Sequence, residues 1–382
     1  MKWIGWILLI LMAAVPAPAA RKVTVQQLQD LLQSLQQAKK ADAEVADELM
    51  QIELTEEMTK STMDSLTSFV PGPLTANQMY VLEARSAMLA PPAADLPSIP
   101  APDAAAQKAL LDKAVDYATK TYAQLPHLTA TKTTFRFQDI LNPAVATNQG
   151  KPPDKASTDS GRANGGPSIY YVGTTETQVE SQNGAEILTG VKDATQWGAN
   201  GQIALLGQGP VLSTVIQEAQ AAGKINWLRW ETVNGKQTAV FSFAVEKKKS
   251  HYAVNYCCFP DTDQSRMNMV NQGLQPGTAG NLQAGINWVP YKATVPYHGE
   301  LFVDSQDGIV VRLIAEADFK PFETVHQEDT RIDYGTMTVG GKPLVVPVGM
   351  IIDTEVFPGT TDSAGKRITR RTLFIADYKD YK

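Results

Sequence analysis

Apolar residues recur at every third or fourth position through the first third of the chain, which is the spacing of helices with one buried face. This pattern predicts three helices, over residues 25–35, 42–66 and 75–88. Thr24 and Thr75 stand where N-cap residues are expected. Asp103 would cap a fourth helix, which the pair Leu125-Pro126 would end.

From Thr129 onward the apolar period changes to two, the spacing of strands. Strands are predicted over residues 129–137, 169–182, 185–188, 225–233, 238–245, 252–259, 298–304, 309–315, 330–334, 344–354 and 370–377. Asn183-Gly184 and Asn234-Gly235 are typical of two-residue hairpin turns. One helix interrupts the series: Gly209-Pro210 would open it, and Gly223 stands where a C-terminal glycine is expected.

Successive hairpins build antiparallel sheets, because parallel strands need long crossover connections. The sequence therefore predicts an α+β fold, with a helical N-terminal region followed by a large, mostly antiparallel curved β-sheet that carries one inserted helix. The predicted parts are a helical region at 21–90, a linker rich in proline and alanine at 91–102, a connecting helix at 103–126 and a β-rich domain at 127–382. A polar stretch at 148–167 predicts a mobile loop within that domain.

Residues 1–20 have the three parts of a secretory signal peptide. Lys2 supplies the positive charge, Trp3 to Val15 the apolar segment, and the small residues Ala17, Ala19 and Ala20 the cleavage site. The apolar segment is shorter than the roughly 20 residues that span a membrane. We therefore expect a periplasmic or extracellular protein with no stable membrane anchor.

Composition narrows the classes of partner. The chain has 43% apolar residues and a formal net charge of −6, so it can build a core and has no overall positive charge that would attract nucleic acid. Its cysteines are Cys257 and Cys258, so the cysteine that bacterial lipoproteins place after the signal peptide is missing. We expect no nucleic-acid partner, no lipid anchor and no cofactor.

Sequence motifs for known catalytic sites are missing. The chain contains neither the His-Glu-x-x-His motif of zinc proteases nor the Gly-x-Ser-x-Gly motif of serine hydrolases. Gly340-Gly341-Lys342 resembles part of a phosphate-binding loop, but Pro343 stands where a hydroxyl residue is needed, so a turn between strands explains it better. No catalytic residue is predicted, and a non-enzymatic role is favoured over an enzyme without a recognisable motif.

Two pairs of residues have the spacing of metal ligands on a strand. His298 with Glu300, and His326 with Glu328, each lie two positions apart and would share a strand face. If the two strands were neighbours, the four side chains would suit zinc. Hydrogen-bonded or surface histidines are the favoured interpretation, and no metal is predicted.

Aromatic residues gather in the predicted strands around residue 240. Alternation places Ile225, Trp227 and Arg229 on one face of their strand and Trp230 on the other. Filling the core is one explanation for these residues, and lining a groove for a ligand or a partner is the other. The residues that would line such a groove are Trp227, Trp230, Phe241, Phe243, Tyr252 and Tyr256.

Several stretches resemble a group of uncharacterised exported proteins that are widespread in acidobacteria. They are Val23-Thr-Val-Gln-Gln-Leu, Leu54-Thr-Glu-Glu-Met, the segment 125–137, Val240-Phe-Ser-Phe, Tyr297-His-Gly-Glu-Leu-Phe-Val-Asp, Asp333-Tyr-Gly, Leu344-Val-Val-Pro-Val and Phe374-Ile-Ala-Asp-Tyr-Lys. The resemblance implies export but supplies no activity, cofactor or catalytic residue. The hairpin over 299–313 is also similar to those of periplasmic lipoprotein carriers, whose half-open barrels hold acyl chains.

Two functions follow as hypotheses. The first is a binding or carrier protein that holds a lipid or another amphipathic small molecule on a concave sheet. The second is a structural or protein-interaction module of the cell envelope, in which the N-terminal helices bind a partner protein and the sheet is a scaffold. An open cavity on the inner sheet face would favour the first hypothesis, and a filled core there would count against it.

Overall fold

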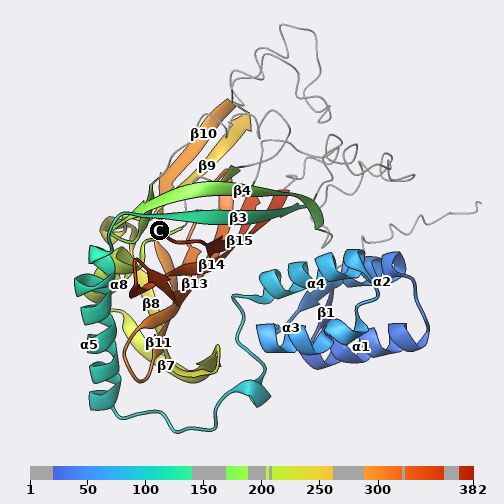
Figure 1. Cartoon of the computed structure of the whole chain (residues 1–382), viewed down its shortest axis with the longest axis horizontal. Helices are drawn as coiled ribbons and strands as arrows, with labels where there is room; N and C mark the ends of the chain where they lie inside the picture. Colours follow the sequence, from blue (N-terminus) through green and yellow to red (C-terminus); the bar gives the residue numbers. More distant parts are fainter. Residues whose placement is uncertain are drawn as a thin grey trace, which may run out of the picture.

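A computed structural model describes residues 20–139, 169–187, 204–205, 209–260, 288–320, 323–356 and 370–382. The predicted signal peptide, apart from Ala20, and the predicted loop at 148–167 lie outside these residues. The observed fold is α+β, as predicted. Its helices are mostly N-terminal, and most of its strands form one antiparallel sheet (Figure 1).

The N-terminal region folds into a unit of four helices around a short parallel strand pair. Its elements are β1 (Arg21–Val23), α1 (Val25–Gln37), α2 (Asp42–Leu49), β2 (Ile52–Leu54), α3 (Lys60–Leu66) and α4 (Pro73–Ser86). The prediction for Thr24 is confirmed. Its hydroxyl accepts the N–H of Gln27, and the Gln27 side chain accepts the N–H of Thr24 in return, which is a complete capping box.

Two predictions for this unit are wrong. The single helix over 42–66 is interrupted, because Ile52 is fully buried in β2, which pairs in parallel with β1. Thr75 does not cap α4, which starts at Pro73 after Gly72. Instead, the carboxylate of Asp42 accepts the N–H groups of Leu74 and Thr75 at 3.0 and 2.9 Å. A side chain of α2 thus accepts the backbone N–H groups that have no partner within α4 at its N-terminal end.

Ten antiparallel strands make the main sheet, in the order β5-β4-β3-β15-β14-β13-β12-β11-β8-β7. Their bounds, in that order, are Ala185–Ile187, Tyr170–Gln182, Leu128–Gln138, Arg370–Lys379, Lys342–Val356, Val325–Val339, Val310–Ala317, Tyr297–Asp304, Lys236–Val245 and Ile225–Val233. A smaller sheet contains β10 (Trp288–Thr294), β9 (Ala253–Pro260) and β6 (Ala204–Leu205).

Glycine turns set the register of the hairpins, as predicted. Asn183-Gly184 and Asn234-Gly235 both have positive φ angles at the two turn residues, the conformation that twists with the flanking strands. Gly340-Gly341 has the same signature between β13 and β14, so the segment is a strand-to-strand turn.

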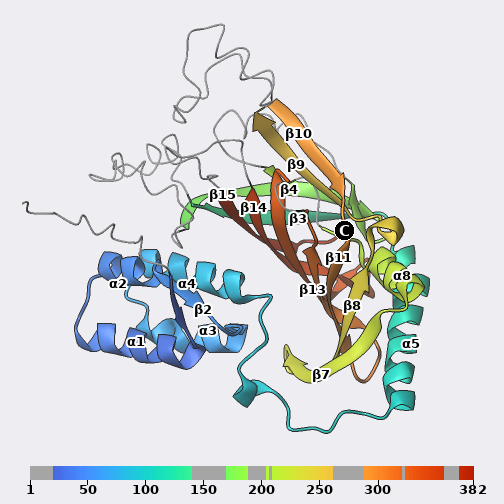
Figure 2. The ribbon, with the colours of Figure 1, turned by 180° about the vertical axis from the view of Figure 1, so that it is seen from behind.

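The main sheet curls around one hydrophobic core. Side chains of one face, from Trp227 in β7 at one edge to Val179 in β4 near the other, belong to a single cluster. Two helices fill this inner face: α5 (Ala104–Lys120), which Asp103 caps as predicted, and α8 (Leu212–Ala222), which ends at Gly223 with φ 67°. Figure 2 shows α8 and α5 beside β8 and β11, on the side away from the N-terminal unit.

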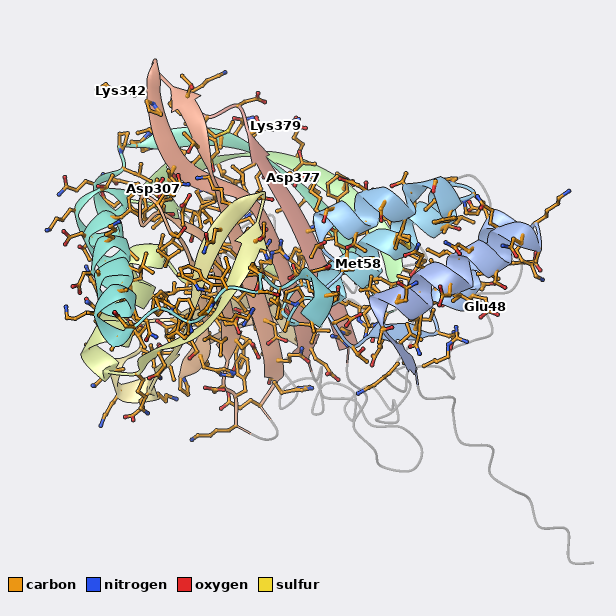
Figure 3. All side chains as sticks on the ribbon, turned by 90° about the horizontal axis from the view of Figure 1, so that it is seen from below. Glu48, Met58, Asp307, Lys342, Asp377 and Lys379 are labelled. Atoms are coloured by element: carbon orange, nitrogen blue, oxygen red, sulfur yellow. The ribbon has the colours of Figure 1, made fainter. Side chains whose placement is uncertain are left out.

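Close contacts tie α5 to the sheet. The turn between β11 and β12, where Figure 3 labels Asp307, lies beside α5, and Lys113 Nζ donates to the carbonyl of Gln306 at 3.3 Å. Gly308 has φ +78°, and a Cβ there would lie 2.4 Å from Cβ of Lys113. Only glycine allows the turn to approach the helix this closely.

The N-terminal unit packs on the outer face of the sheet. Val81 and Ala84 of α4 are buried against Phe137 and Leu373, and Met88 packs on a second apolar cluster that includes Phe302. In Figure 3, Met58 lies on the side of the unit nearest the sheet, whereas Glu48 lies at its outer side. The helical region predicted at 21–90 is thus joined to the sheet by a packed contact.

Candidate functional site

The two tryptophans of the predicted aromatic groove lie on the same face of β7, contrary to the alternation rule. A bulge at Leu228 shifts the register, so Trp227 is opposite Phe241 while Trp230 is opposite Ala239. Their rings contact edge to face with centroids 4.8 Å apart. Trp230 Nε1 donates to the carbonyl of Pro100 at 3.0 Å, so the Pro/Ala-rich segment 91–102 is held against this edge of the sheet.

The other four predicted aromatic residues are buried in the core. Phe241, Phe243, Tyr252 and Tyr256 are each at most 5% exposed. Tyr297 joins two of them, with its ring centroid 5.8 Å from that of Phe243 and 5.4 Å from that of Tyr252. Such edge-to-face pairs stabilise a core beyond their buried area.

Buried side chains of α5, α8 and the main sheet pack into one cluster on the described part of the inner face. The cavity found there measures about 10 Å³ and is lined by residues that include Leu128, Val179 and Tyr378, which leaves room for about one water molecule. The aromatic residues that the sequence assigned to a groove are thus packed against each other, the sheet and α8.

The four candidate metal ligands are not brought together. β12 lies between β11 and β13, so the strands of His298 and His326 are not neighbours. Glu300 binds Arg229 at 2.9 Å, and His326 lies 3.6 Å from Glu355. Within the described ranges, no group of three or more His, Cys, Asp or Glu side chains is arranged to hold a metal ion.

His298 is held by two carboxylates on the outer face. It lies 3.5 Å from Glu316 and 3.0 Å from Asp318. The hydrogen bond to Glu316, with the charges of both carboxylates, raises the pKa of His298 to about 9. This imidazole is therefore protonated at neutral pH, a state that does not bind zinc.

The structure brings together three of the residues that the sequence analysis singled out, namely Tyr252, Tyr256 and Glu328. They belong to a buried group of side-chain oxygens that we call the interior polar cluster. Its members are Tyr252, Tyr256, Glu328, Thr330 and Thr354, each at most 5% exposed. Tyr252 donates a short hydrogen bond to Glu328 Oε1, and the hydroxyls of Tyr256 and Thr354 share another. The sequence analysis missed the two threonines, although polar residues at the buried positions of β13 and β14 were the signal.

A second buried carboxylate on the inner face is fully satisfied. Glu218 of α8 accepts hydrogen bonds from the N–H of His251 at 2.7 Å and from the hydroxyl of Tyr297 at 2.7 Å, and it also contacts Nδ1 of His251 at 2.6 Å. It joins α8 to β11 and to the chain before β9. Glu328, by contrast, keeps one carboxylate oxygen, Oε2, without a partner in hydrogen-bond geometry.

An open groove lies on the N-terminal unit. It has a volume of about 300 Å³ and lies at the C-terminal end of α1. Its lining residues are Leu35, Gln36, Lys39, Lys40, Val45, Phe69, Val70 and Pro71. We call it the α1 groove. Its volume is at the lower end of the range for ligand pockets, and its lining combines five apolar residues with one glutamine and two lysines.

Buried ion pairs fix the N-terminal unit to the sheet. Glu57 Oε1 lies 2.8 Å from Arg331 Nη1 and 3.2 Å from Arg312 Nη1, and both guanidinium groups also bind Asp333. The side chains of Glu57 and Arg312 are 4% and 8% exposed. Because charges buried to this extent are costly to separate, the pairs hold the unit in one orientation.

A row of carboxylates crosses the outer face of the sheet. Asp329 lies directly opposite Glu316 on one side and Asp353 on the other. Burial is the main reason that the pKa of Asp329 is raised to about 7, and the two neighbouring carboxylates add to the effect. Arg371 binds Asp353 through a short ion pair and partly offsets the repulsion.

Replacing Asp329 by asparagine should stabilise the protein increasingly as the pH rises. A carboxyl whose folded pKa is raised contributes stability below its unfolded pKa near 4 and loses it as the pH rises through about 7. We expect little difference at pH 4 and a gain of up to about 4 kcal/mol for Asp329→Asn at pH 8, because folding raises the pKa from 3.8 to about 7. Urea denaturation at the two pH values measures it, and equal differences at both would contradict the raised pKa.

Comparison with known protein families, with curated proteins and with solved structures found no match. In the parts of the chain that the structure describes, no helix has both the length and the apolar character needed to cross a bilayer.

Proposed function

We propose that this protein is a non-enzymatic interaction module of the cell envelope, in which the N-terminal unit binds a partner protein and the curled sheet is the scaffold. The observation that carries the proposal is the α1 groove, an open apolar site on a unit that buried ion pairs hold rigidly against the sheet. Export by a cleaved signal peptide, and the resemblance to exported acidobacterial proteins, are parts of the same proposal.

The carrier hypothesis is less well supported because a ligand on the inner face must displace α8. Leu212, Val215 and Ile216 of this helix are fully buried against the sheet. Each such side chain contributes about 1.5–3 kcal/mol by burial, so exposing three costs about 5 kcal/mol or more. The α1 groove needs no such rearrangement.

The lysines that line the α1 groove indicate the chemistry of the partner. Lys40 is paired with Glu44 at 2.8 Å, whereas Lys39 makes no ion pair with any described carboxylate. Lys39 is exposed and lines the same groove as the apolar residues Phe69 and Val70. We therefore expect a partner segment that inserts an apolar side chain and places a carboxylate beside Lys39.

Photo-crosslinking in intact host cells tests this function. A benzophenone amino acid in place of Lys39 should give one discrete adduct whose cross-linked peptide contains an apolar residue beside Asp or Glu. The matched control replaces Gln26, an exposed residue about 20 Å away at the other end of α1. Equal adducts at both positions, or none at position 39, would reject the proposal.

Reversing the charge at the groove should weaken binding of the captured partner. Because Lys39→Glu turns an attraction into a repulsion, we expect the Kd to rise about tenfold, with greater loss at low salt than at high salt. Lys108→Glu on the exposed surface of α5 is the control and should leave the Kd unchanged. Titration of the purified partner against each variant gives the comparison, and a similar Kd for all three proteins would rule out the charge contact.

A further inference from the structure

Two buried oxygens of the interior polar cluster have no partner in hydrogen-bond geometry, although the hydroxyls of Tyr252 and Tyr256 lie close to Thr330 and Glu328. These two oxygens are Glu328 Oε2 and Thr330 Oγ1, on side chains that are each 1% exposed. The two residues lie two positions apart in β13, so they share the inner face of the strand. Buried polar atoms are almost always paired, and an unpaired one in a native fold often marks a bound water or ion.

Protein donors near these oxygens are already committed. The hydroxyl of Tyr252 donates to Glu328 Oε1, and the hydroxyl of Tyr256 is shared with Thr354. Both tyrosines lie close to Glu328, whose carboxyl group raises the pKa of each phenol in addition to the effect of burial. The cluster therefore has oxygens from five side chains around one carboxyl group.

Two described cations lie on the inner face, but neither balances this carboxyl group. Lys132 is paired with Glu186, and Arg136 stacks on Phe374 in β15, two strands away from Glu328. Gln327, Asp329 and Arg331 alternate with Glu328 and Thr330, so they lie on the outer face. The inner positions that follow in β13 are the apolar Ile332 and Tyr334. From the smaller sheet the cluster is faced by Tyr252 and Tyr256, and Tyr291 is bound to Glu323.

We propose that the interior polar cluster binds a monovalent cation between Glu328 Oε2 and Thr330 Oγ1, with hydroxyl oxygens of the cluster as further ligands. All available donors are oxygens, which suit hard cations, and sulfur or imidazole ligands are missing from the cluster. One carboxylate balances one positive charge, whereas divalent calcium sites collect several carboxylates. Sodium, potassium and an ammonium group share this chemistry.

Such a cation would join the two sheets. Tyr256 lies in β9 of the smaller sheet and Tyr252 directly precedes that strand, whereas Glu328 and Thr354 lie in β13 and β14 of the main sheet. A cation at Glu328 therefore stabilises the position of the smaller sheet on the larger one. The site is independent of the α1 groove and of the proposed partner.

Protons compete with the cation for the same oxygen. Burial raises the pKa of Glu328, so without a cation the carboxyl group keeps its proton to a higher pH than an exposed glutamate does. The stability that the neutral form contributes is present below the unfolded pKa near 4.5 and is lost as the pH rises through the raised value. Cation binding should offset this loss at high pH.

The test is thermal unfolding of the full chain at pH 8 in choline chloride, whose bulky cation does not suit a site among closely packed, buried side chains. Replacing choline by sodium, potassium or ammonium at constant ionic strength should raise the Tm by about 3–5 °C at a hundredfold excess over Kd. The rise should saturate with concentration and shrink at pH 5. A response to sodium or potassium indicates a metal ion, and a response to ammonium alone indicates an amine ligand.

Variants locate the site. Glu328→Gln keeps the shape but removes the charge, so its Tm should be the same in all four salts, and Thr330→Val should weaken the response. The matched control is Glu218→Gln, which removes the other buried carboxylate of the inner face and should keep the response. A wild-type Tm that ignores the cation, or a Glu328→Gln variant that still responds, would overturn the proposal.

Discussion

Replacing Glu57 by alanine is expected to release the N-terminal unit from the sheet. The carboxylate is the contact of this unit with Arg312 and Arg331, and its loss leaves two guanidinium groups buried with too little negative charge. Breaking one partner of a buried ionic group costs about 3–5 kcal/mol. The apolar contacts of Val81, Ala84 and Met88 with the sheet remain in the variant, but they do not neutralise the two guanidinium groups.

Two measurements check the effect of Glu57→Ala. Limited proteolysis should cut within the Pro/Ala-rich segment 91–102, which Trp230 holds in the intact protein, and thermal unfolding should show a separate early transition for the N-terminal unit. Lys108→Ala, which breaks an exposed pair with Asp112, should cost less than about 0.5 kcal/mol. A Glu57→Ala protein as stable as the control would mean that the ion pairs do not position the unit.

Replacing Ile216 by alanine should destabilise the protein by about 2–5 kcal/mol, because a fully buried side chain would leave a cavity between α8 and the sheet. Gln217, the next residue, is exposed, so Gln217→Ala should change the free energy of unfolding by less than about 0.5 kcal/mol. Urea denaturation of the two variants gives both values.

The result for Ile216→Ala separates the two functions considered for the sheet. A large cost means that α8 is part of the core, which fits a scaffold. A cost close to that of Gln217→Ala would mean that α8 rests loosely on the inner face, as a displaceable lid does, and would favour the carrier hypothesis. Unlike the carrier function, the proposed cation site requires no movement of α8, because its ligands are the oxygens of the interior polar cluster.

Local signals in the sequence correctly predicted many of the elements. The capping box at Thr24, the cap at Asp103 and the turns at Asn183 and Asn234 are each decided by groups within a few residues of each other. The period of the apolar residues correctly separated the helical N-terminal third from the antiparallel sheet. The α+β class followed from these signals alone.

The predictions from local sequence signals were wrong where residues distant in the sequence determine the local structure. β2 broke the expected helix because Ile52 pairs with β1, and Asp42 rather than Thr75 satisfies the start of α4. The bulge at Leu228 reversed the expected faces of Trp227 and Trp230. Neither a strand partner nor a bulge leaves a mark in the periodicity of a single segment.

By itself, the sequence determined the order and type of most elements and their hairpin turns, because hydrogen bonds between near neighbours decide them. Only the tertiary structure decided that α5 and α8 pack on the inner face of the main sheet, and which side chains distant in the sequence come into contact. Tyr252 and Glu328 are 76 positions apart, and Glu57 and Arg312 are 255 apart. Contacts at such separations depend on how the sheet curls and where the N-terminal unit packs, so the interior polar cluster and the ion pairs at Glu57 emerge only from the folded chain.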